Sequence, residues 1–218
     1  TFDYDMDMKV STLLKQSEVV GGHDPADYHS ERLYAEVRDG KKVPISIVYK
    51  KGYKKNGQGN LLLYAYGSYG STNDPSFSST RLSLLDRGFA YAIAHIRGSQ
   101  TYGRPWYEDG KMFHKMNTFN DFVDCSKYLI QNNYTDPGHL FAMGGSAGGL
   151  LMGAVVNLAP ELYRGVIAAV PFVDVINTML DASIPLTSNE WDEWGDPRKK
   201  DEYEYMMTYS PYDNVYNA

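Results

Sequence analysis

The stretch Gly144-Gly145-Ser146-Ala147-Gly148-Gly149 is the most informative part of this 218-residue sequence. An apolar run precedes it and an apolar segment with helical character follows it. A serine at the apex of a sharp strand-to-helix turn is the pattern of a nucleophile elbow, and glycines keep side chains out of the crowded turn. The stretch therefore predicts a serine nucleophile for acyl transfer. A glycine-rich turn that binds an anion at the start of a helix has the same pattern.

Strands and helices alternate from Glu31 onward, which is typical of an α/β domain with a mostly parallel sheet and helices on both faces. The Asp39-Gly40 pair predicts a tight turn, so the first two strands should be antiparallel. The expected strands are 33–37, 44–49, 61–66, 89–95, 140–144 and 166–171, and the expected helices are 80–86, 117–132 and the segment after Ser146.

The place of Ser146 among these elements predicts an α/β-hydrolase fold. Ser146 follows the fifth strand, where that fold carries its nucleophile. The loop Tyr64–Gly70 follows the third strand, where the fold places a hydrogen-bond donor to the oxyanion hole. Two motifs far apart in the sequence thus fall where one architecture needs them.

The histidines indicate that part of the catalytic machinery lies outside the chain. In this fold the acid and the histidine of a catalytic triad follow the serine. All histidines here precede it, and His95 is disfavoured as a substitute base for that reason. We expect a fragment, truncated before the last strands, whose triad Asp and His lie beyond Ala218 and which has little or no turnover alone. The five histidines are His23, His29, His95, His114 and His139.

Residues 1–20 are expected to belong to a different unit from the rest. Residues 2–14 alternate in the manner of short antiparallel strands, and Gly21-Gly22 marks a linker. Residues 21–218 would then form the N-terminal part of the hydrolase domain.

Charge, hydrophobicity and cysteine content indicate which partners and which location to expect. The net charge is −6 and there is no long basic run, which argues against nucleic acid or an anionic membrane as a partner. No apolar stretch reaches the roughly 18 residues of a membrane span, and the first 20 residues lack a signal-peptide core, so we expect a cytoplasmic protein. The single Cys125 cannot form an internal disulfide and is expected to be buried on a helix.

Eight stretches together make the chain similar to the prolyl oligopeptidase family of serine peptidases. This resemblance covers essentially the whole chain, and it implies a parent protein with a β-propeller, of which residues 1–20 would be the end or the connector. It also implies cleavage of short peptides after Arg or Lys, without metal or organic cofactor. The stretches are Tyr64–Gly70, Arg81–Phe89, Trp106–Gly110, Asn117–Asp121, Met143–Gly149, Val170–Val175, Thr178–Asp181 and Tyr209–Val215.

The resemblance also implies roles for three catalytic residues. Ser146 would be the nucleophile, and the oxyanion hole would combine the hydroxyl of Tyr66 with the backbone N–H of Ala147. Removal of one such donor typically lowers the rate about 100- to 1,000-fold. The alternative for Tyr66 is a packing aromatic at a strand end, and Tyr64 and Tyr69 are neighbours that could be confused with it.

Four residues are candidates for substrate binding by the same resemblance. Glu190 would contact the P1 side chain, Asp192 would support it, and Phe172 would pack against the aliphatic stem of that side chain. The family more often has Glu at the position of Asp192, and without the resemblance the acidic segment would be an ordinary solvated surface. Asp74 matches an acidic residue associated with a basic P2 side chain, but it also suits a turn before proline. The second acidic position of that pair is Ser76 here.

Two other functions remain open from the sequence. One is an esterase or acylaminoacyl peptidase on the same fold, against which the Glu190 segment and the Tyr66 loop argue. The other is a non-catalytic α/β interaction module that retains the elbow. Expected partners are short basic peptides, a C-terminal part and a propeller of the same protein, and further copies of the chain through an open sheet edge.

Overall fold

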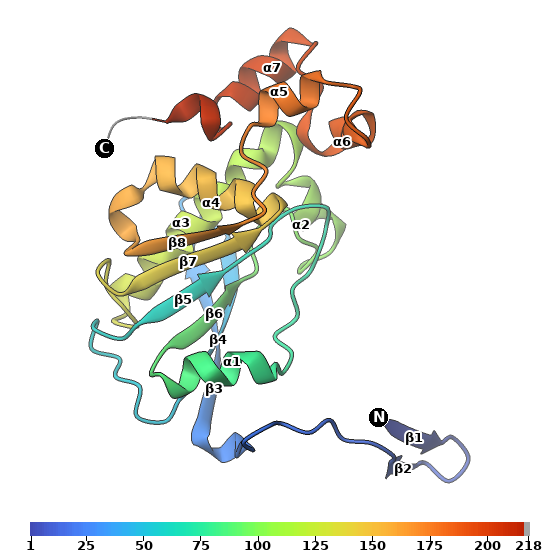
Figure 1. Ribbon diagram of the computed structural model, residues 1–218, viewed down its shortest axis with the longest axis vertical. Coiled ribbons are helices and arrows are strands. Elements are labelled where there is room, and N and C mark those ends of the chain that lie inside the picture. The colour runs from blue at the N-terminus through green and yellow to red at the C-terminus, as the bar shows by residue number, and fades with distance from the viewer. Residues whose placement is uncertain (216–218) are drawn as a thin grey trace.

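In the computed structural model, which describes residues 1–215, a six-stranded sheet carries helices on both faces (Figure 1). The fold class predicted from the sequence is therefore confirmed. In spatial order the strands are β3 (Tyr28–Glu36), β4 (Lys42–Lys50), β6 (Ala90–Ala94), β5 (Leu61–Tyr64), β7 (Leu140–Gly145) and β8 (Gly165–Ala169).

Strand directions follow the expected pattern. The β3–β4 pair is antiparallel, with Tyr28 opposite Lys50 and Glu36 opposite Lys42, and β4–β6 is antiparallel as well. The β5–β6, β5–β7 and β7–β8 pairs are parallel. The turn after β3 closes with a hydrogen bond of 2.8 Å from the N–H of Gly40, whose φ is 80°, to the carbonyl of Val37.

The sheet separates two hydrophobic cores, one under the helices on each face. Leu61 and Leu63 belong to the large core under α3 and α4, whereas Leu62 belongs to a smaller core under α1, because successive strand residues point to opposite faces. The helices are α1 (Ser79–Asp86), α2 (Arg104–Glu108), α3 (Lys115–Gln131), α4 (Ala147–Leu158), α5 (Val175–Leu180), α6 (Thr187–Trp194) and α7 (Lys200–Met207).

Element bounds differ from the expectation where hydrophobicity is a poor guide. β3 begins at Tyr28, five residues early, because its first residues pair with β4 although most of them are exposed. β5 ends at Tyr64, which leaves Tyr66 in the loop that follows. Helices α2, α5, α6 and α7 were not expected. They are short, and their sequences have no long apolar periodicity.

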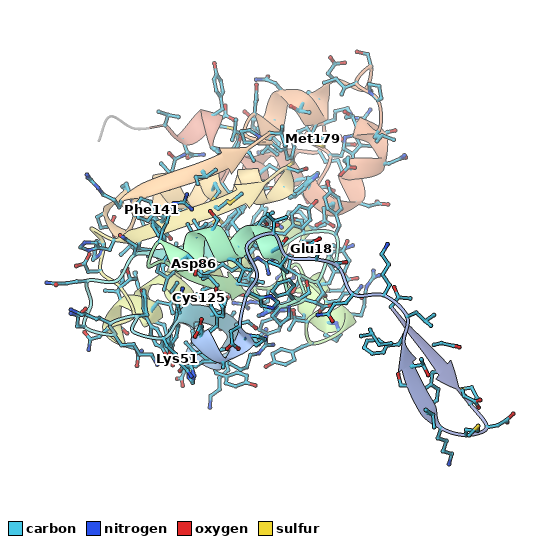
Figure 2. The ribbon with its side chains drawn as sticks, turned by 60° about the horizontal axis from the view of Figure 1, so that its bottom comes forward. Glu18, Lys51, Asp86, Cys125, Phe141 and Met179 are labelled. Carbon is cyan, nitrogen blue, oxygen red and sulfur yellow. The ribbon has the colours of Figure 1, made fainter. Side chains whose placement is uncertain are left out.

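The N-terminal segment is a separate hairpin. β1 (Phe2–Asp5) pairs antiparallel with β2 (Val10–Leu13), and every residue of both strands is exposed. Figures 1 and 2 both show it projecting away from the sheet. The alternating pattern in residues 2–14 is thus a strand pattern, as expected, while the domain boundary near residue 20 stays a prediction.

The interior and the edge of the sheet contrast in exposure. Cys125 on α3 is fully buried, as expected, and burial raises the pKa of its thiol. β8 pairs with β7 alone among residues 1–215, and Ile167 and Val170 beside that edge are 49% and 84% exposed.

Among the helices in this part of the chain, none has the length and apolar character needed to cross a membrane.

Candidate active site

Ser146 lies at the apex of the turn between β7 and α4 and is exposed. Its φ of 56° and ψ of −116° are rare for a residue with a side chain and cost energy, so the surroundings must hold them in place. The backbone supplies that support. The N–H of Ser146 donates to the carbonyl of Ala169 at 2.9 Å, and the carbonyl of Ser146 accepts from the N–H groups of Gly149 at 2.8 Å and Phe172 at 3.3 Å.

Two glycines of the elbow are required by close backbone contacts. A Cβ on Gly144 would lie 2.2 Å from the carbonyl oxygen of Gly148. A Cβ on Gly148 would lie 2.9 Å from the carbonyl oxygen of Ala65 and 3.4 Å from Cα of Tyr66. The elbow therefore packs directly against the loop after β5, and the second contact brings the two motifs together.

Tyr66 is half-buried in that loop and lies beside Ser146. Burial raises the pKa of Tyr66, and the nearby Ser146 side chain opposes this rise. Tyr64 instead packs on the α1 side of the sheet, and Tyr69 donates its hydroxyl hydrogen to Glu190. Of the three tyrosines, Tyr66 is the one with its phenol at the serine.

The N–H of Ala147 completes this group of donors. Ala147 is the first residue of α4 and is 3% exposed, so its N–H belongs to the free amides at a helix start. Within residues 1–215 it has no hydrogen-bond acceptor. A phenol and a free amide beside an exposed serine can together bind an oxygen that becomes negative when the serine adds to a carbonyl.

Glu190 lies on α6 in an aromatic setting. Its Oε2 accepts hydrogen bonds from the hydroxyl of Tyr69 and, at 3.2 Å, from Nε1 of Trp194. The ring of Phe172 packs on Trp194 at a centroid distance of 5.4 Å. The structure thus brings Glu190 and Phe172 to the same tryptophan, which joins an acidic group to an apolar wall.

Asp192 lies apart from this group. Residues two apart on a helix do not face each other, and the exposed side chain of Asp192 has no hydrogen bond or ion pair within the described residues. Glu193, three residues after Glu190, faces inward instead. Its Oε1 accepts from the N–H of Tyr69 at 2.8 Å and its Oε2 from the hydroxyl of Tyr107 at 2.5 Å. Glu193 ends the acidic stretch that begins at Glu190, and helical spacing from Glu190 is the sequence signal for its separate, inward-facing position.

Asp74 lies on a different part of the molecular surface from Glu190. It is exposed and lines a hollow of about 540 Å³ with Tyr64, Met143 and other residues between the loop after β5 and the α1 face of the sheet. Within the described chain it has no hydrogen bond with Glu190 or Ser146. Its proposed contact with a P2 side chain stays a prediction.

His95 has a structural setting. Burial, and then the charge of Arg32, lower the pKa of His95 to about 4, and Asp74 opposes that shift. Its Nε2 lies 2.8 Å from Nη1 of Arg32 and 2.9 Å from Oγ of Ser46. No hydrogen bond joins a histidine to Ser146 in residues 1–215, and no group of three or more His, Cys, Asp or Glu side chains in these residues could hold a metal ion.

The strand order, the strained serine between β7 and α4 and the adjoining loop define a class of protein, the α/β-hydrolases. The sequence profile described as "Prolyl oligopeptidase family" matches residues 75–218, which is more than half of the chain. The chain belongs to this family of peptidases.

Relatives with similar sequences cover nearly all of the chain. Dipeptidyl aminopeptidase BI of Pseudoxanthomonas mexicana is 56% identical over 203 residues, which are 93% of this chain and 28% of that protein. Protease 2 of Moraxella lacunata is 53% identical over 215 residues, which are 99% of this chain and 31% of that protein. Oligopeptidase B from Leishmania major superimposes with a TM-score of 0.94 at 48% identity, over 98% of this chain and 30% of that one. The chain spans about three tenths of the length of these curated relatives.

Proposed function

We propose that this chain is the nucleophile-bearing part of a serine peptidase of the oligopeptidase B type, which cleaves short peptides after Arg or Lys. The observation that carries the proposal is the exposed Ser146 in strained geometry with the Tyr66 phenol beside it. The sequence and structural likeness to oligopeptidase B supports the same conclusion.

In the proposed reaction, Oγ of Ser146 attacks the scissile carbonyl carbon while a histidine takes its proton. The Tyr66 hydroxyl and the Ala147 N–H donate hydrogen bonds to the oxygen that becomes negative. The leaving amine departs with that proton, and water then hydrolyses the acyl-enzyme. We assign the histidine and its aspartate to parts of the intact protein outside this chain, because the chain matches only about three tenths of its relatives.

The raised pKa of Tyr66 suits this role. A phenol whose pKa lies above its ordinary value of about 10 stays protonated throughout the neutral range. It can therefore donate a hydrogen bond during every turnover without first losing its proton.

The proposed preference for Arg and Lys rests on Glu190. A guanidinium that approaches its carboxylate in this partly buried setting forms charge-assisted hydrogen bonds, which are stronger than neutral ones. Phe172 and Trp194 offer apolar surface for the methylene groups of the same side chain. The exposed Asp192 and Asp74 would act at outer positions of the substrate, where water screens their charge.

We extend the proposal to partners and location. The intact protein would be cytoplasmic, would carry a β-propeller beside the hydrolase domain and would need no cofactor, metal, nucleic acid or membrane. The segment alone would have little or no turnover, because triad members act as a unit. The exposed β8 edge would allow copies of the isolated segment to associate.

The experiment uses the intact protein with N-terminally blocked peptide amides that carry Arg, Lys or Gln at P1. We expect Arg and Lys substrates to have kcat/KM at least about 100-fold above Gln, since each charged hydrogen bond contributes about 1.5–3 kcal/mol. A fluorophosphonate should label the wild type but not Ser146→Ala. Equal cleavage of all three substrates, or labelling that survives Ser146→Ala, would refute the proposal.

A second candidate is the release of dipeptides from free N-termini, which the name of the 56% identical relative supports. Peptides of the same sequence with free and acetylated N-termini distinguish the two. Cleavage of the acetylated peptide favours the oligopeptidase, whereas dipeptide release from the free peptide alone favours the second candidate. Hydrolysis of neutral esters without peptide cleavage would indicate the esterase alternative, and absence of labelling would indicate a non-catalytic module.

A further inference from the structure

The loop after β5 has an unusual backbone. Gly67, Tyr69 and Gly70 have φ values of 73°, 56° and 66°, so three of four successive residues adopt left-handed geometry. Tyr69 carries a side chain in that geometry, which is unfavourable unless neighbouring groups enforce it. The residue directly before this strained run is Tyr66. The direction of its phenol therefore depends on whatever holds the run in place.

Lys115, on α3, holds the strained run Gly67–Gly70 in place. It is the first residue of α3 and is 1% exposed. Its Nζ donates to the carbonyl of Gly67 at 2.7 Å, to Oγ of Ser68 at 2.8 Å and to the carbonyl of Gly110 at 3.2 Å. These three bonds use all three ammonium hydrogens. Two of them fasten the strained run to the start of a long core helix.

Glu193 holds the next residue of the run from the side of α6. It is 3% exposed, and its Oε1 accepts the N–H of Tyr69 at 2.8 Å. Gly67, Ser68 and Tyr69 are thus each bonded to a buried charged side chain from a helix. Trp194 lies beside Lys115, whose Nζ is 5.0 Å from the indole centroid.

Fold stability alone does not account for this lysine. Its three acceptors are neutral, and no carboxylate of residues 1–215 lies within ion-pair distance of Nζ. A buried ammonium without an ion pair is costly, and burial lowers the pKa of Lys115 to about 7, with Glu193 opposing the shift. A methionine would fill the same space without that cost. Compared with methionine, the ammonium group of Lys115 adds the hydrogen bonds to Gly67 and Ser68.

We infer that Lys115 is a positioning residue of the proposed peptidase: through Gly67 and Ser68 it fixes the loop backbone so that the Tyr66 phenol faces Ser146. This inference rests on the proposed function. Lys115 acts through Tyr66 and does not touch the reacting atoms. Substitution of Lys115 should therefore weaken binding of the transition state more than binding of the substrate.

The test is Lys115→Met in the intact protein, with Lys127→Met as the matched control on an exposed site of the same helix. We expect Lys115→Met to lower kcat at least about tenfold with KM for the Arg substrate changed less than about threefold, as for a displaced oxyanion donor. The Ki of a peptide aldehyde ending in argininal should rise by a similar factor, since its hemiacetal oxygen occupies the oxyanion hole. Lys127→Met should match the wild type.

A double-mutant cycle with Tyr66→Phe separates positioning from general damage. If Lys115 acts through the phenol, Lys115→Met in the Tyr66→Phe background should lower kcat less than about twofold further. Independent, multiplicative losses would overturn the inference, as would an unchanged kcat in Lys115→Met. Should Lys115→Met fail to fold, Ser68→Ala decides, because it removes one acceptor of Nζ and should lower kcat a few-fold without raising KM.

These outcomes are distinct from failure of the proposed function. A wild-type protein that neither reacts with fluorophosphonate nor cleaves the Arg substrate refutes the peptidase proposal and the inference with it. A fully active wild type whose Lys115→Met variant is equally active refutes the inference alone.

Discussion

The elbow and the Glu190 cluster, which consists of Glu190, Tyr69, Trp194 and Phe172, are built by different means, although one loop contacts both. The apex at Ser146 is held by backbone hydrogen bonds and by glycine contacts that leave no room for a Cβ. The Glu190 cluster is held by side chains from distant segments, with Tyr69 and Trp194 donating to one carboxylate oxygen. The elbow should therefore be intolerant of added volume, and the Glu190 cluster should be sensitive to lost charge.

The largest effect is expected from added volume at the elbow. Gly144→Ala brings a Cβ to 2.2 Å from the Gly148 carbonyl oxygen, so the turn must move. We expect kcat of the intact protein to fall roughly 10,000-fold, because a misplaced nucleophile and a misplaced oxyanion amide each cost about 100-fold or more. The free energy of unfolding should fall by about 3 kcal/mol. Stopped-flow kinetics and urea unfolding measure the two effects.

Gly145→Ala is the matched control for this change. A Cβ there lies 3.5 Å from the carbonyl oxygen of Ala169, which is ordinary contact. Its kcat should stay within about threefold of the wild type. Equal damage from both variants would mean that volume at the apex is not what the glycines protect.

The next effect is expected from the phenol between the two regions. Tyr66→Phe removes one donor to the oxyanion and should lower kcat about 100- to 1,000-fold with little change in KM. Tyr64→Phe, on the α1 side of the sheet, should leave both constants unchanged. A loss confined to KM would place Tyr66 in substrate binding and weaken the contrast between the two regions.

A smaller effect is expected from lost charge in the Glu190 cluster. Glu190→Gln should lower kcat/KM for an Arg substrate about 10- to 100-fold and leave a Gln substrate unchanged, because one charge-assisted interaction is lost. Asp192→Asn, on the exposed side of the same helix, should change it less than about threefold. Equal losses from the two variants would show that long-range charge, rather than contact, selects the substrate.

The smallest effect on activity is expected at His95, which belongs to neither region. The unfolded chain binds a proton near pH 6.5, whereas burial, and then Arg32, lower the pKa of folded His95 to about 4. Unfolding therefore takes up a proton between these values, and stability falls as pH drops from 6.5 to 4.

His95→Asn should reduce that fall by about 3 kcal/mol without altering kcat at pH 8. A large loss of kcat in His95→Asn would show that this histidine affects catalysis and that its role is not structural alone.

The same contrast explains what the sequence could predict. The elbow is a local motif, so its strand, turn and helix follow from one run of residues, and the fold follows from the order of six strands. The Glu190 cluster joins residues that are more than 100 positions apart, such as Tyr69 and Glu190. No periodicity predicts that contact, and the family resemblance supplied Glu190 but neither Glu193 nor Lys115.

Lys115 shows why some site residues escape prediction. Lysine is ordinarily a surface residue, and this one precedes the segment in which helical spacing becomes evident. Only the approach of the loop to the start of α3 gives it three buried acceptors. The short helices α5, α6 and α7 escaped prediction for a related reason, since tertiary packing rather than a local pattern stabilises them.

The sharing of one loop between Tyr66 and Tyr69 has an evolutionary consequence. Substitutions in this loop that alter the Glu190 cluster would also move Tyr66, so selection for other substrates would lower the rate of the proposed reaction. Glu190 on α6 offers a freer route, because it contacts the loop only through side chains. Descendants with new preferences should therefore diverge at α6 while the tyrosine loop is inherited almost intact.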